Sequence, residues 1–501
     1  MNNSVKIKLD VPCETLEIIE VLQNKGFLAY LVGGCVRDNL IGREPKDWDI
    51  ATNATPEQIQ ALFAKTVYEN LFGTVTVVNE TTENKTLKNI EVTPFRIEAD
   101  YSDRRHPDQV KFSDKLEDDL ARRDFTINAL AYSPADSELI DLYGGVKDIK
   151  DKSIKTVGEA DKRFREDALR MLRAIRLACE LGFTCNKEIL DSISRNSDLL
   201  KEISIERIRD EFVKMIDSPE PMNGLILSHK TGVLSHILPE LERGIGMEQK
   251  GEHVYDIWEH TLRSVQHAAD KNYPLHVKLA ALFHDISKTK TRRPASAKAT
   301  AGKAGKEYTF YGHEVVGERM TVEIMSRLKF SGKEIELVQK MVRNHMFFAD
   351  PDKITLSAVR RVIANVGPEY IWDLMNLRIC DRIGMGRPKE EPYRLRKYES
   401  MIEEALRAPT SVGMLKIDGK QVMAVTCETS GPKIGYILNA LLEEALENPD
   451  INNDEFLVKR AKELVKLPEN KLKELAERGK DKKEKVEQEE LKKIRDKYRV
   501  K

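Results

Sequence analysis

The sequence predicts an α+β protein whose N-terminal head, with a mixed β-sheet and helices, is followed by all-α domains. Two observations predict this class. The first 150 residues combine short runs of branched apolar residues, typical of strands, with amphipathic stretches typical of helices. From about residue 151 the apolar residues repeat at helical spacing instead. A chain of 501 residues has room for about three domains and several cores.

The composition limits the class of protein further. Hydrophobic residues make up 41% of the chain and charged residues 33%, which describes a soluble, helix-rich protein. The six cysteines form no CxxC pair, so we expect reduced thiols in the cytoplasm rather than disulfides or a zinc ribbon. Neither a signal peptide nor an apolar run of about 18 residues occurs, so we expect no membrane partner. The formal net charge is −1, so a nucleic acid would have to bind local basic patches. No segment indicates a protein partner.

The strongest chemical signal is the segment at residues 31–50, LVGGCVRDNLIGREPKDWDI. Its apolar start predicts a buried strand. Gly33 and Gly34 then let the backbone turn sharply and come close to a ligand. Arg37 follows at the point where a short helix is expected.

Asp47 and Asp49 end this segment on a second predicted strand. Residues two apart on a strand share a face, so the two carboxylates project together while Trp48 and Ile50 point into a core. Neighbouring carboxylates repel each other unless a cation lies between them, and hard oxygen ligands suit Mg²⁺. Beside a glycine turn and an arginine, such a pair predicts in-line attack on a phosphate. Taken alone, the two aspartates also fit a solvated sheet edge.

Residues 25–465 resemble the class II nucleotidyltransferases, the family of the CCA-adding tRNA enzymes and the bacterial poly(A) polymerases. The family pattern of an apolar strand, GG-x-VRD, a spacer and D-x-D is matched in full by residues 31–50. The resemblance implies that Asp47 and Asp49 are catalytic and hold Mg²⁺. It also implies nucleotide-binding roles for Gly33, Gly34 and Arg37.

Two further parts of the head have alternative interpretations. Glu91 lies on a predicted strand at 89–92, where the wider superfamily has a third carboxylate, and it fits a solvent-facing position equally well. The loop at 96–110 contains the charged run at 103–107, DRRHP. It resembles a flexible loop that CCA-adding enzymes have and A-adding relatives shorten, and it also fits a solvated surface loop.

Residues 119–131, DLARRDFTINALA, resemble the family's RRDxxxNA motif. Arg122 and Arg123 are expected to form charge-assisted hydrogen bonds with triphosphate oxygens. Asp124 and Asn128 lie four apart, on one face of the segment if it is helical. We expect them to hold a ribose hydroxyl.

Residues 164–183 predict one amphipathic helix that ends at Gly182. One face carries polar residues at a spacing of three, namely Asp167, Arg170, Arg173 and Arg176. This face matches the family's EDxxR template motif and the arginines that follow it. A carboxylate only accepts hydrogen bonds and a guanidinium only donates them. Asp167 and Arg170, one turn apart, are therefore expected to select the amino group and ring nitrogen that cytosine and adenine share. A solvated basic face is the alternative.

A third region contains histidines and aspartates in an order that resembles the HD phosphohydrolases, including the residues of a two-metal site. The set is His260, His284, Asp285, His313, His345 and Asp381. Imidazole suits a divalent transition metal, whose identity the sequence leaves open. The family's HDxGK consensus reads HDISK at 284–288, and the serine affects fine geometry rather than ligation. A single histidine on a helix usually serves packing instead.

The resemblance and the changes in composition predict five parts. They are a nucleotidyltransferase head (1–150), a helical neck for nucleobase selection and RNA binding (151–250), an HD domain (251–386), a helical tRNA-binding tail (387–467) and a charged tail (468–501). Residues 294–306 have low complexity and are expected to be a loop insertion. The charged tail is expected to be a solvated helix or a disordered segment.

The resemblance implies a cytoplasmic tRNA nucleotidyltransferase that adds CCA to the tRNA 3′ end from CTP and ATP with Mg²⁺ and releases pyrophosphate. It also implies an accessory HD phosphohydrolase activity. Within the family, the alternatives are a poly(A) polymerase and a CC-adding enzyme. An alternative of another class is an HD nucleotide hydrolase with a non-catalytic RNA-binding head, against which the intact Asp47 and Asp49 argue. The absence of a GxxxxGK[ST] motif disfavours a P-loop enzyme.

Overall fold

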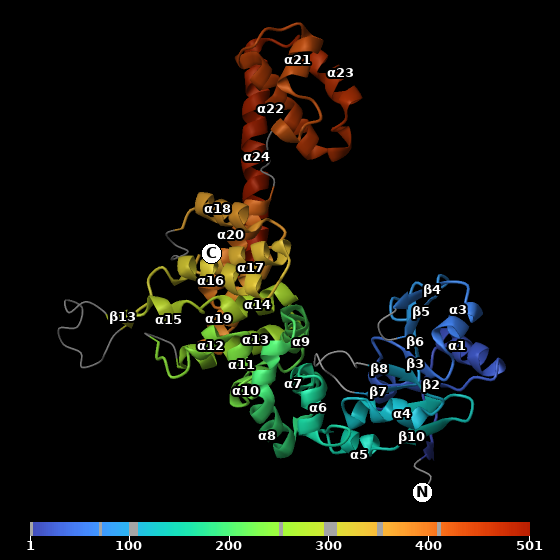
Figure 1. Ribbon diagram of the computed structural model, residues 1–501. Helices are drawn as coiled ribbons and strands as arrows, with labels where there is room; N and C mark the ends of the chain where they lie inside the picture. The colour runs from blue at the N-terminus through green and yellow to red at the C-terminus, as the bar shows by residue number, and fades with distance from the viewer. Residues whose placement is uncertain are drawn as a thin grey trace. The chain divides into compact units, whose positions relative to one another are not determined.

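The structure is a computed structural model that describes residues 4–69, 73–99, 109–249, 254–294, 308–347, 354–407 and 412–500 (Figure 1). The chain forms two compact units. The first contains residues 1–343 and 376–388, and the second contains residues 344–375 and 389–501. The charged loop residues 103–107 and nearly all of the predicted insertion, residues 295–306, lie outside the described residues.

The head contains an eight-stranded mixed sheet with the order β1-β10-β9-β2-β3-β6-β5-β4. Its strands are β1 (Ser4–Lys6), β2 (Ala29–Val32), β3 (Asp49–Thr52), β4 (Thr66–Glu69), β5 (Thr74–Val78), β6 (Asn89–Pro94), β9 (Leu130–Ser133) and β10 (Glu138–Asp141). Only β3 and β6 pair in parallel among the strand pairs described in this sheet. The mixed sheet and the α+β class are confirmed.

The register of the central strands sets the position of the head's polar residues. Leu31 of β2 pairs with Ile50 of β3. The glycine turn that follows β2 therefore lies beside the start of β3. Both partners are almost fully buried, so the two strand ends are fixed by the core.

Four short helices accompany the sheet in the head: α1 (Cys13–Asn24), α2 (Gly34–Leu40), α3 (Pro56–Leu62) and α4 (Leu116–Ala121). Helices α1 and α3 account for amphipathic stretches of the first 150 residues. The start of α3 follows from its sequence, because Thr55 and Gln58 form a reciprocal capping box and Pro56 occupies the first turn.

Several strands were missing from the prediction. β9 is central, yet its residues follow the RRDxxxNA motif without a turn signal, and its four residues are all buried. A short buried run of this kind cannot be separated from helix by periodicity. β1, β4 and the separate hairpin of β7 (Arg96–Ala99) and β8 (Gln109–Phe112) were also missed.

The helices that follow the strands of the head sheet in the first unit are α5 (Gly145–Lys150), α6 (Ala160–Glu166), α7 (Leu169–Leu181), α8 (Lys187–Asn196), α9 (Ile205–Asp217), α10 (Pro221–Lys230), α11 (Leu234–Ile237) and α12 (Pro239–Glu242). The single helix predicted at 164–183 is wrong. Asp167 interrupts it with extended backbone angles (φ −142°, ψ 106°), and its Oδ1 accepts a hydrogen bond from the Leu169 amide at 3.0 Å. Aspartate competes in this way with helical hydrogen bonds. The predicted end at Gly182 is confirmed by its left-handed conformation.

A second group of helices completes the first unit. It consists of α13 (Ile257–Asp270), α14 (Leu275–Phe283), α15 (Lys288–Thr291), α16 (His313–Arg327), α17 (Gly332–Asn344) and the end of α19 (Ile371–Gly384). α19 begins in the second unit and ends in the first, because the boundary falls between Met375 and Asn376.

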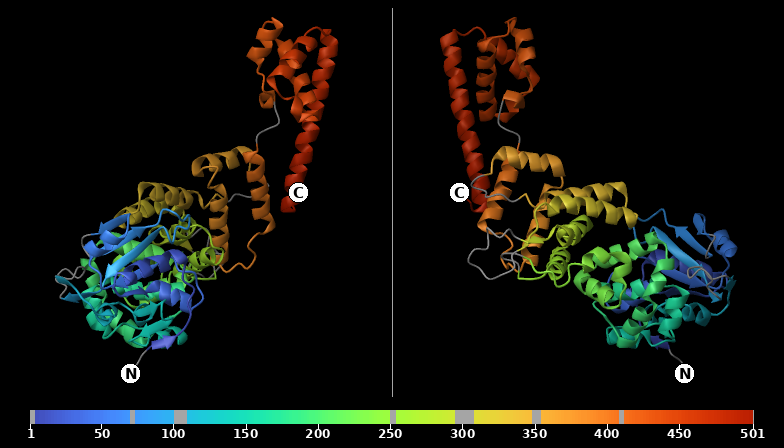
Figure 2. Two further views of the ribbon diagram at one scale, coloured as in Figure 1. Left: turned by 90° about the vertical axis from the view of Figure 1, so that its right-hand side faces the viewer. Right: turned by 60° about the vertical axis from the view of Figure 1, so that its left-hand side comes forward.

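The second unit is helical. Its other helices are α18 (Leu356–Val366), α20 (Tyr393–Leu406), α21 (Gly419–Thr426), α22 (Pro432–Glu447), α23 (Asp454–Leu464) and α24 (Glu469–Tyr498). The charged segment at 468–501 forms the long helix α24, which runs alongside α22 (Figure 2). Leu472 and Ala476 are buried there, so α24 contributes to the core of this unit rather than being fully solvated. Among the described residues, no helix combines the length and apolar character needed to cross a membrane.

Candidate active site and candidate metal centre

Most residues predicted for the head line one cavity of about 590 Å³ in the first unit. They come from the turn after β2, the start of β3, the segment around η1 (Thr126–Asn128) and α7. These lining residues are Gly33, Gly34, Arg37, Asp47, Asp49, Arg123, Asp124, Asn128, Arg173 and Arg176. Asp167 and Arg170 are not part of this lining.

The strand predicted to carry both aspartates of the head begins only at the second of them. Asp49 begins β3 and Asp47 precedes it, while Trp48 is 4% exposed and Ile50 is fully buried. Gly33 lies directly against this pair at a φ of +83°. A β-carbon on Gly33 would stand 2.8 Å from Arg123 Nη1 and 3.5 Å from Asp49 Oδ2. The positive φ favours glycine here, and the missing side chain lets Arg123 lie beside the turn.

Asp49 is in an unusual electrostatic environment. Burial raises the pKa of its carboxyl, as do the nearby Asp47 and Glu91 carboxylates, and together they outweigh the opposing effect of Arg123 to give a pKa of about 7. Glu91 is the register partner of Asp49 across β3 and β6. Three acidic groups thus gather at one end of these strands. Carboxylate oxygens are the ligands that Mg²⁺ prefers.

A chain of polar contacts joins α2, η1 and α7 along the cavity. Arg37 Nη1 donates to Asn128 Oδ1 at 2.6 Å, and Asn128 Nδ2 donates to Asp124 Oδ1 at 3.2 Å. Arg173 Nη2 lies 2.9 Å from Asp124 Oδ2. Burial favours the neutral acid, but Arg173 and Arg170 lower the pKa of Asp124 below its ordinary value. Asp124 and Asn128 do meet as predicted, although a loop and a 3-10 turn bring them together rather than an α-helix.

The two arginines of the RRDxxxNA motif share one carboxylate. Asp119 is fully buried, and its Oδ1 lies 2.6 Å from Arg122 Nη2 while its Oδ2 lies 3.1 Å from Arg123 Nη2. Burial raises the pKa of Asp119, and the two guanidinium groups outweigh it and lower that pKa. Asp119 therefore orients Arg123 beside Gly33.

Asp167 and Arg170 make other contacts in this structure. Asp167 Oδ2 lies 2.8 Å from Arg207 Nη2, and Arg170 Nη1 lies 2.6 Å from Glu166 Oε2. Both residues are buried, with 9% and 7% exposure. The predicted geometry, one turn apart on a single helix, is wrong because Asp167 lies in the break between α6 and α7. Their role in base selection stays a prediction.

Helix α9 forms a wall of the cavity that the sequence analysis missed. Its lining residues are Glu211, Lys214 and Asp217, followed by Ser218 and Pro219. Arg176 lies between two carboxylates, with Nε 2.6 Å from Glu211 Oε2 and Nη1 2.6 Å from Glu180 Oε2. No spacing in the sequence marks this wall, because it forms only when α9 packs against α7.

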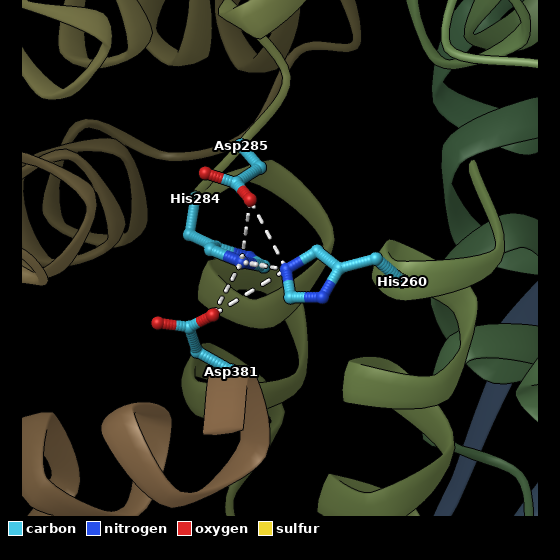
Figure 3. Close-up of side chains that lie close together, drawn as sticks. All are labelled: His260, His284, Asp285 and Asp381. Carbon is cyan, nitrogen blue, oxygen red and sulfur yellow. Dashed lines mark hydrogen bonds and ion pairs between the residues drawn. The ribbon is translucent and has the colours of Figure 1, made fainter. Parts of the chain in front are cut away.

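The second site lies among the helices that follow. The side chains of His260, His284, Asp285 and Asp381 point toward one another (Figure 3). The two histidine Nε2 atoms are 2.9 Å apart, and His260 Nε2 lies 3.0 Å from Asp285 Oδ2 and 3.4 Å from Asp381 Oδ1. All four residues are at most 2% exposed. Converging imidazole and carboxylate atoms at such distances are a donor set for a metal ion.

Contacts behind the ligand atoms fix the orientation of two histidines. His284 Nδ1 lies 2.8 Å from the carbonyl oxygen of Ala281, and His313 Nδ1 lies 2.9 Å from that of Phe310. A carbonyl oxygen only accepts, so Nδ1 carries a proton in both rings, and Nε2 is the nitrogen that would bind a metal after losing its own proton. His313 Nε2 lies 3.4 Å from Asp285 Oδ1. His345 belongs to the second unit, so its part in this centre stays a prediction.

The charges of this centre reinforce one another. Burial favours neutral groups, yet Lys288 and His284 hold the pKa of Asp285 well below its ordinary value. Burial also disfavours a charged His284, but the Asp285 and Asp381 carboxylates raise its pKa to about 10. Ser287, which replaces the consensus glycine, is buried and donates from Oγ to the carbonyl oxygen of His313 at 2.6 Å. The substitution thus ties the HD turn to α16.

Three family models match the chain. The poly A polymerase head domain matches residues 29–155, the probable RNA and SrmB-binding site of polymerase A matches residues 182–245, and the HD domain matches residues 257–381. These matches include strands β2 to β10, helices α8 to α12 and the histidine–aspartate centre.

Relatives and a solved structure agree with these domains. The CCA-adding enzyme of Latilactobacillus sakei is 47% identical over 221 residues, which cover 44% of this chain and 54% of that enzyme. The CCA-adding enzyme of Geobacillus thermodenitrificans is 45% identical over 240 residues, 48% of this chain and 56% of that enzyme. The chain thus spans about half the length of the curated relatives it matches. A crystal structure of the Bacillus stearothermophilus CCA-adding enzyme in complex with CTP is 28% identical, with a TM-score of 0.58 over 90% of this chain and 96% of that chain.

The fold, the carboxylate cavity and these matches define a protein with a nucleotidyltransferase head and an HD domain. Segments of the chain match the models of the poly A polymerase head domain and its probable RNA-binding region, and about half of the chain is similar to CCA-adding enzymes.

Proposed function

We propose that the protein adds C, C and A to the 3′ end of tRNA from CTP and ATP and releases pyrophosphate. One observation carries the proposal: the Asp47–Asp49 pair opens into a cavity beneath a glycine turn, with Arg123 beside it. The proposal is supported by the CCA-adding relatives, and by the CTP complex of the enzyme from Bacillus stearothermophilus.

Different residues of the cavity bind the metal ion and the triphosphate. Mg²⁺ held by Asp47 and Asp49 would lower the pKa of the tRNA 3′ hydroxyl and stabilise the leaving pyrophosphate. Gly33 and Gly34 leave room for the triphosphate against the backbone, and Arg123 binds its oxygens by charge-assisted hydrogen bonds. Asp119 keeps Arg123 in place for this contact.

The ribose and the base of the nucleotide bind to residues other than those that hold the triphosphate. Asp124 and Asn128 already share a hydrogen bond at the cavity, and they bind the ribose hydroxyl. Asp167 accepts from the exocyclic amino group of cytosine or adenine, and Arg170 donates to the neighbouring ring nitrogen. Because Arg207 and Glu166 occupy these side chains in the present structure, the incoming base must replace those two contacts.

Labelled nucleotides distinguish this function from its alternatives. The purified protein is incubated with tRNA that ends at the discriminator base, or at C or CC, and with each labelled triphosphate separately. CCA addition predicts two C residues and one A, with GTP and UTP rejected. A poly(A) polymerase would add long A tracts, a CC-adding enzyme would stop before A, and a non-catalytic head would incorporate nothing.

We further propose that the HD domain is a phosphohydrolase that uses a divalent transition metal. The observation that favours it is the convergence of His260, His284, Asp285 and Asp381 on one point (Figure 3). Such a metal would activate water for attack on a phosphate ester. The test is hydrolysis of phosphomonoesters and cyclic nucleotides with Mn²⁺, Co²⁺ or Ni²⁺.

The domain division and the location of the protein belong to this proposal. The proposed division has a head at 1–150, a neck at 151–250, an HD domain at 251–386, a tRNA-binding tail at 387–467 and a charged tail at 468–501. The three matched segments support its first three parts. Because tRNA and nucleoside triphosphates are cytoplasmic molecules, a cytoplasmic location goes with this function.

A further inference from the structure

The last residue of α9, Asp217, lines the nucleotide cavity and forms an ion pair with a buried lysine that does not line it. Lys278 of α14 is 5% exposed. Its Nζ lies 2.7 Å from Asp217 Oδ1 and donates to the Asp217 carbonyl oxygen at 3.2 Å. A cation at the C-terminus of a helix also stabilises the helix dipole. Lys278 therefore fixes both the side chain and the backbone at this end of the cavity.

A second contact holds the segment just after α9. Gln266 of α13 donates from Nε2 to the carbonyl oxygen of Pro219 at 2.8 Å and accepts from the Met222 amide at 3.2 Å. Asp217, Ser218 and Pro219 line the cavity, whereas Gln266 and Lys278 do not. Helices α13 and α14 thus form hydrogen bonds with the cavity wall through residues that do not themselves line the cavity.

Helices α13 and α14, which make these contacts, also position two histidines of the metal centre. His260 lies about two turns before Gln266 on α13, and His284 directly follows α14, about two turns after Lys278. We propose that the HD domain positions the nucleotide cavity through Lys278 and Gln266, and that these are positioning residues for nucleotide binding by the head. This inference rests on the proposed nucleotidyl transfer.

The charge of Asp217 determines whether loss of Lys278 strengthens or weakens nucleotide binding. Its side chain is 55% exposed and lines a cavity meant for a triphosphate. With Lys278 in place, the carboxylate is neutralised and turned toward α14. Without Lys278, an unpaired carboxylate at the C-terminus of α9 would repel both the helix dipole and the incoming anion. Binding of CTP and ATP should weaken together.

The test is steady-state addition of one C or one A to tRNA, with the KM for each triphosphate measured separately from kcat. Lys278→Met should raise the KM for both CTP and ATP by about fivefold, the size expected for one partly exposed ion pair, with little change in kcat. Lys278→Arg should restore most of the affinity. Adding Asp217→Asn to Lys278→Met should also restore it, because the repelling charge is gone. Lys340→Met is the matched control, since Lys340 forms an exposed ion pair with Glu336 away from the cavity.

The outcomes separate this proposal from the proposed function. If the unaltered protein incorporates CTP and ATP and Lys278→Met leaves both KM values unchanged, the positioning role is wrong. The same conclusion follows if Asp217→Asn fails to rescue, or if Lys278→Met lowers kcat, the metal content and the melting temperature together, as a general loss of folding would. If the unaltered protein incorporates no nucleotide, the proposed function itself is wrong, and the inference falls with it.

Discussion

The Nε2 atoms of His260 and His284 lie 2.9 Å apart in the interior of the first unit. Asp285 and Asp381 add carboxylate oxygens within 3.7 Å of these nitrogens. Two imidazole nitrogens and two carboxylates brought this close form a set of donors that a metal cation can bind. Our first prediction follows from this arrangement.

Asp285→Ala should remove the divalent metal from the HD domain and abolish phosphohydrolase activity, while CCA addition is largely kept. The measurements are metal content of the purified protein and hydrolysis with added Mn²⁺, Co²⁺ or Ni²⁺. A protein that contains no metal and hydrolyses nothing under any of these conditions would show that the HD domain is only structural.

The second prediction concerns the close approach of α19 to α13. A β-carbon on Gly384 would run into Ser264 Oγ and stand 2.7 Å from the His260 carbonyl oxygen. Asp381 lies one turn earlier on α19, so Gly384→Ala should push Asp381 away from His260 and lower metal binding at least tenfold. Gly435→Ala is the control, because Gly435 is also helical and has open space around it. Unchanged metal affinity in Gly384→Ala would contradict this account of the helix contact.

The third prediction is a pH dependence of Mg²⁺ binding in the head. Asp49 must be ionised to bind a cation, and its pKa is raised to about 7 by burial and by Asp47 and Glu91. Protons therefore compete with Mg²⁺ below pH 7. The Mg²⁺ concentration for half-maximal addition should rise by about tenfold from pH 8 to pH 6. Glu91→Gln removes a neighbouring charge and should move this rise to lower pH. A half-maximal Mg²⁺ concentration that is the same at both pH values would contradict the prediction.

The fourth prediction concerns base choice. Guanine and uracil place a carbonyl and a ring N–H where cytosine and adenine have an amino group and a bare nitrogen. Each mispaired polar group costs on the order of 1–3 kcal/mol. Asp167→Ala should therefore raise GTP and UTP use relative to CTP, and Arg170→Ala should lower CTP and ATP use together. Single-turnover incorporation of each triphosphate measures both effects. If Asp167→Ala kept full activity and still rejected GTP and UTP, Asp167 would not select the base, and the polar face at 167–176 would be only a solvated basic face.

The sequence allowed most of the residues that gather at the two sites to be predicted, but not all of the elements that carry them. Asp47 and Asp49 were identified because a strand period of two and a glycine turn are local signals, and the paired register of β2 and β3 confirms the strand arrangement. The break at Asp167 was missed, because one aspartate that bonds to the Leu169 amide can end a helix whose apolar spacing continues.

Tertiary contacts account for what was missed. Glu211 and Asp217 enter the cavity only because α9 packs on α7, and the grip of Lys278 on Asp217 joins residues 61 apart in the chain. The long charged helix α24 resembled a solvated segment because only a few of its residues, such as Leu472, are buried against α22. Contacts of this kind, between helices distant in the chain, leave no periodic pattern in the sequence.

The most direct test of the central claim is nucleotide addition to tRNA lacking its CCA end, compared among the unaltered protein, Asp47→Ala and Asp49→Ala. Circular dichroism confirms that each variant is folded. We predict that the unaltered protein restores CCA from CTP and ATP and that each variant loses C and A addition alike, by at least a thousandfold in kcat. Near-normal addition by either folded variant would contradict the claim that these two carboxylates perform nucleotidyl transfer.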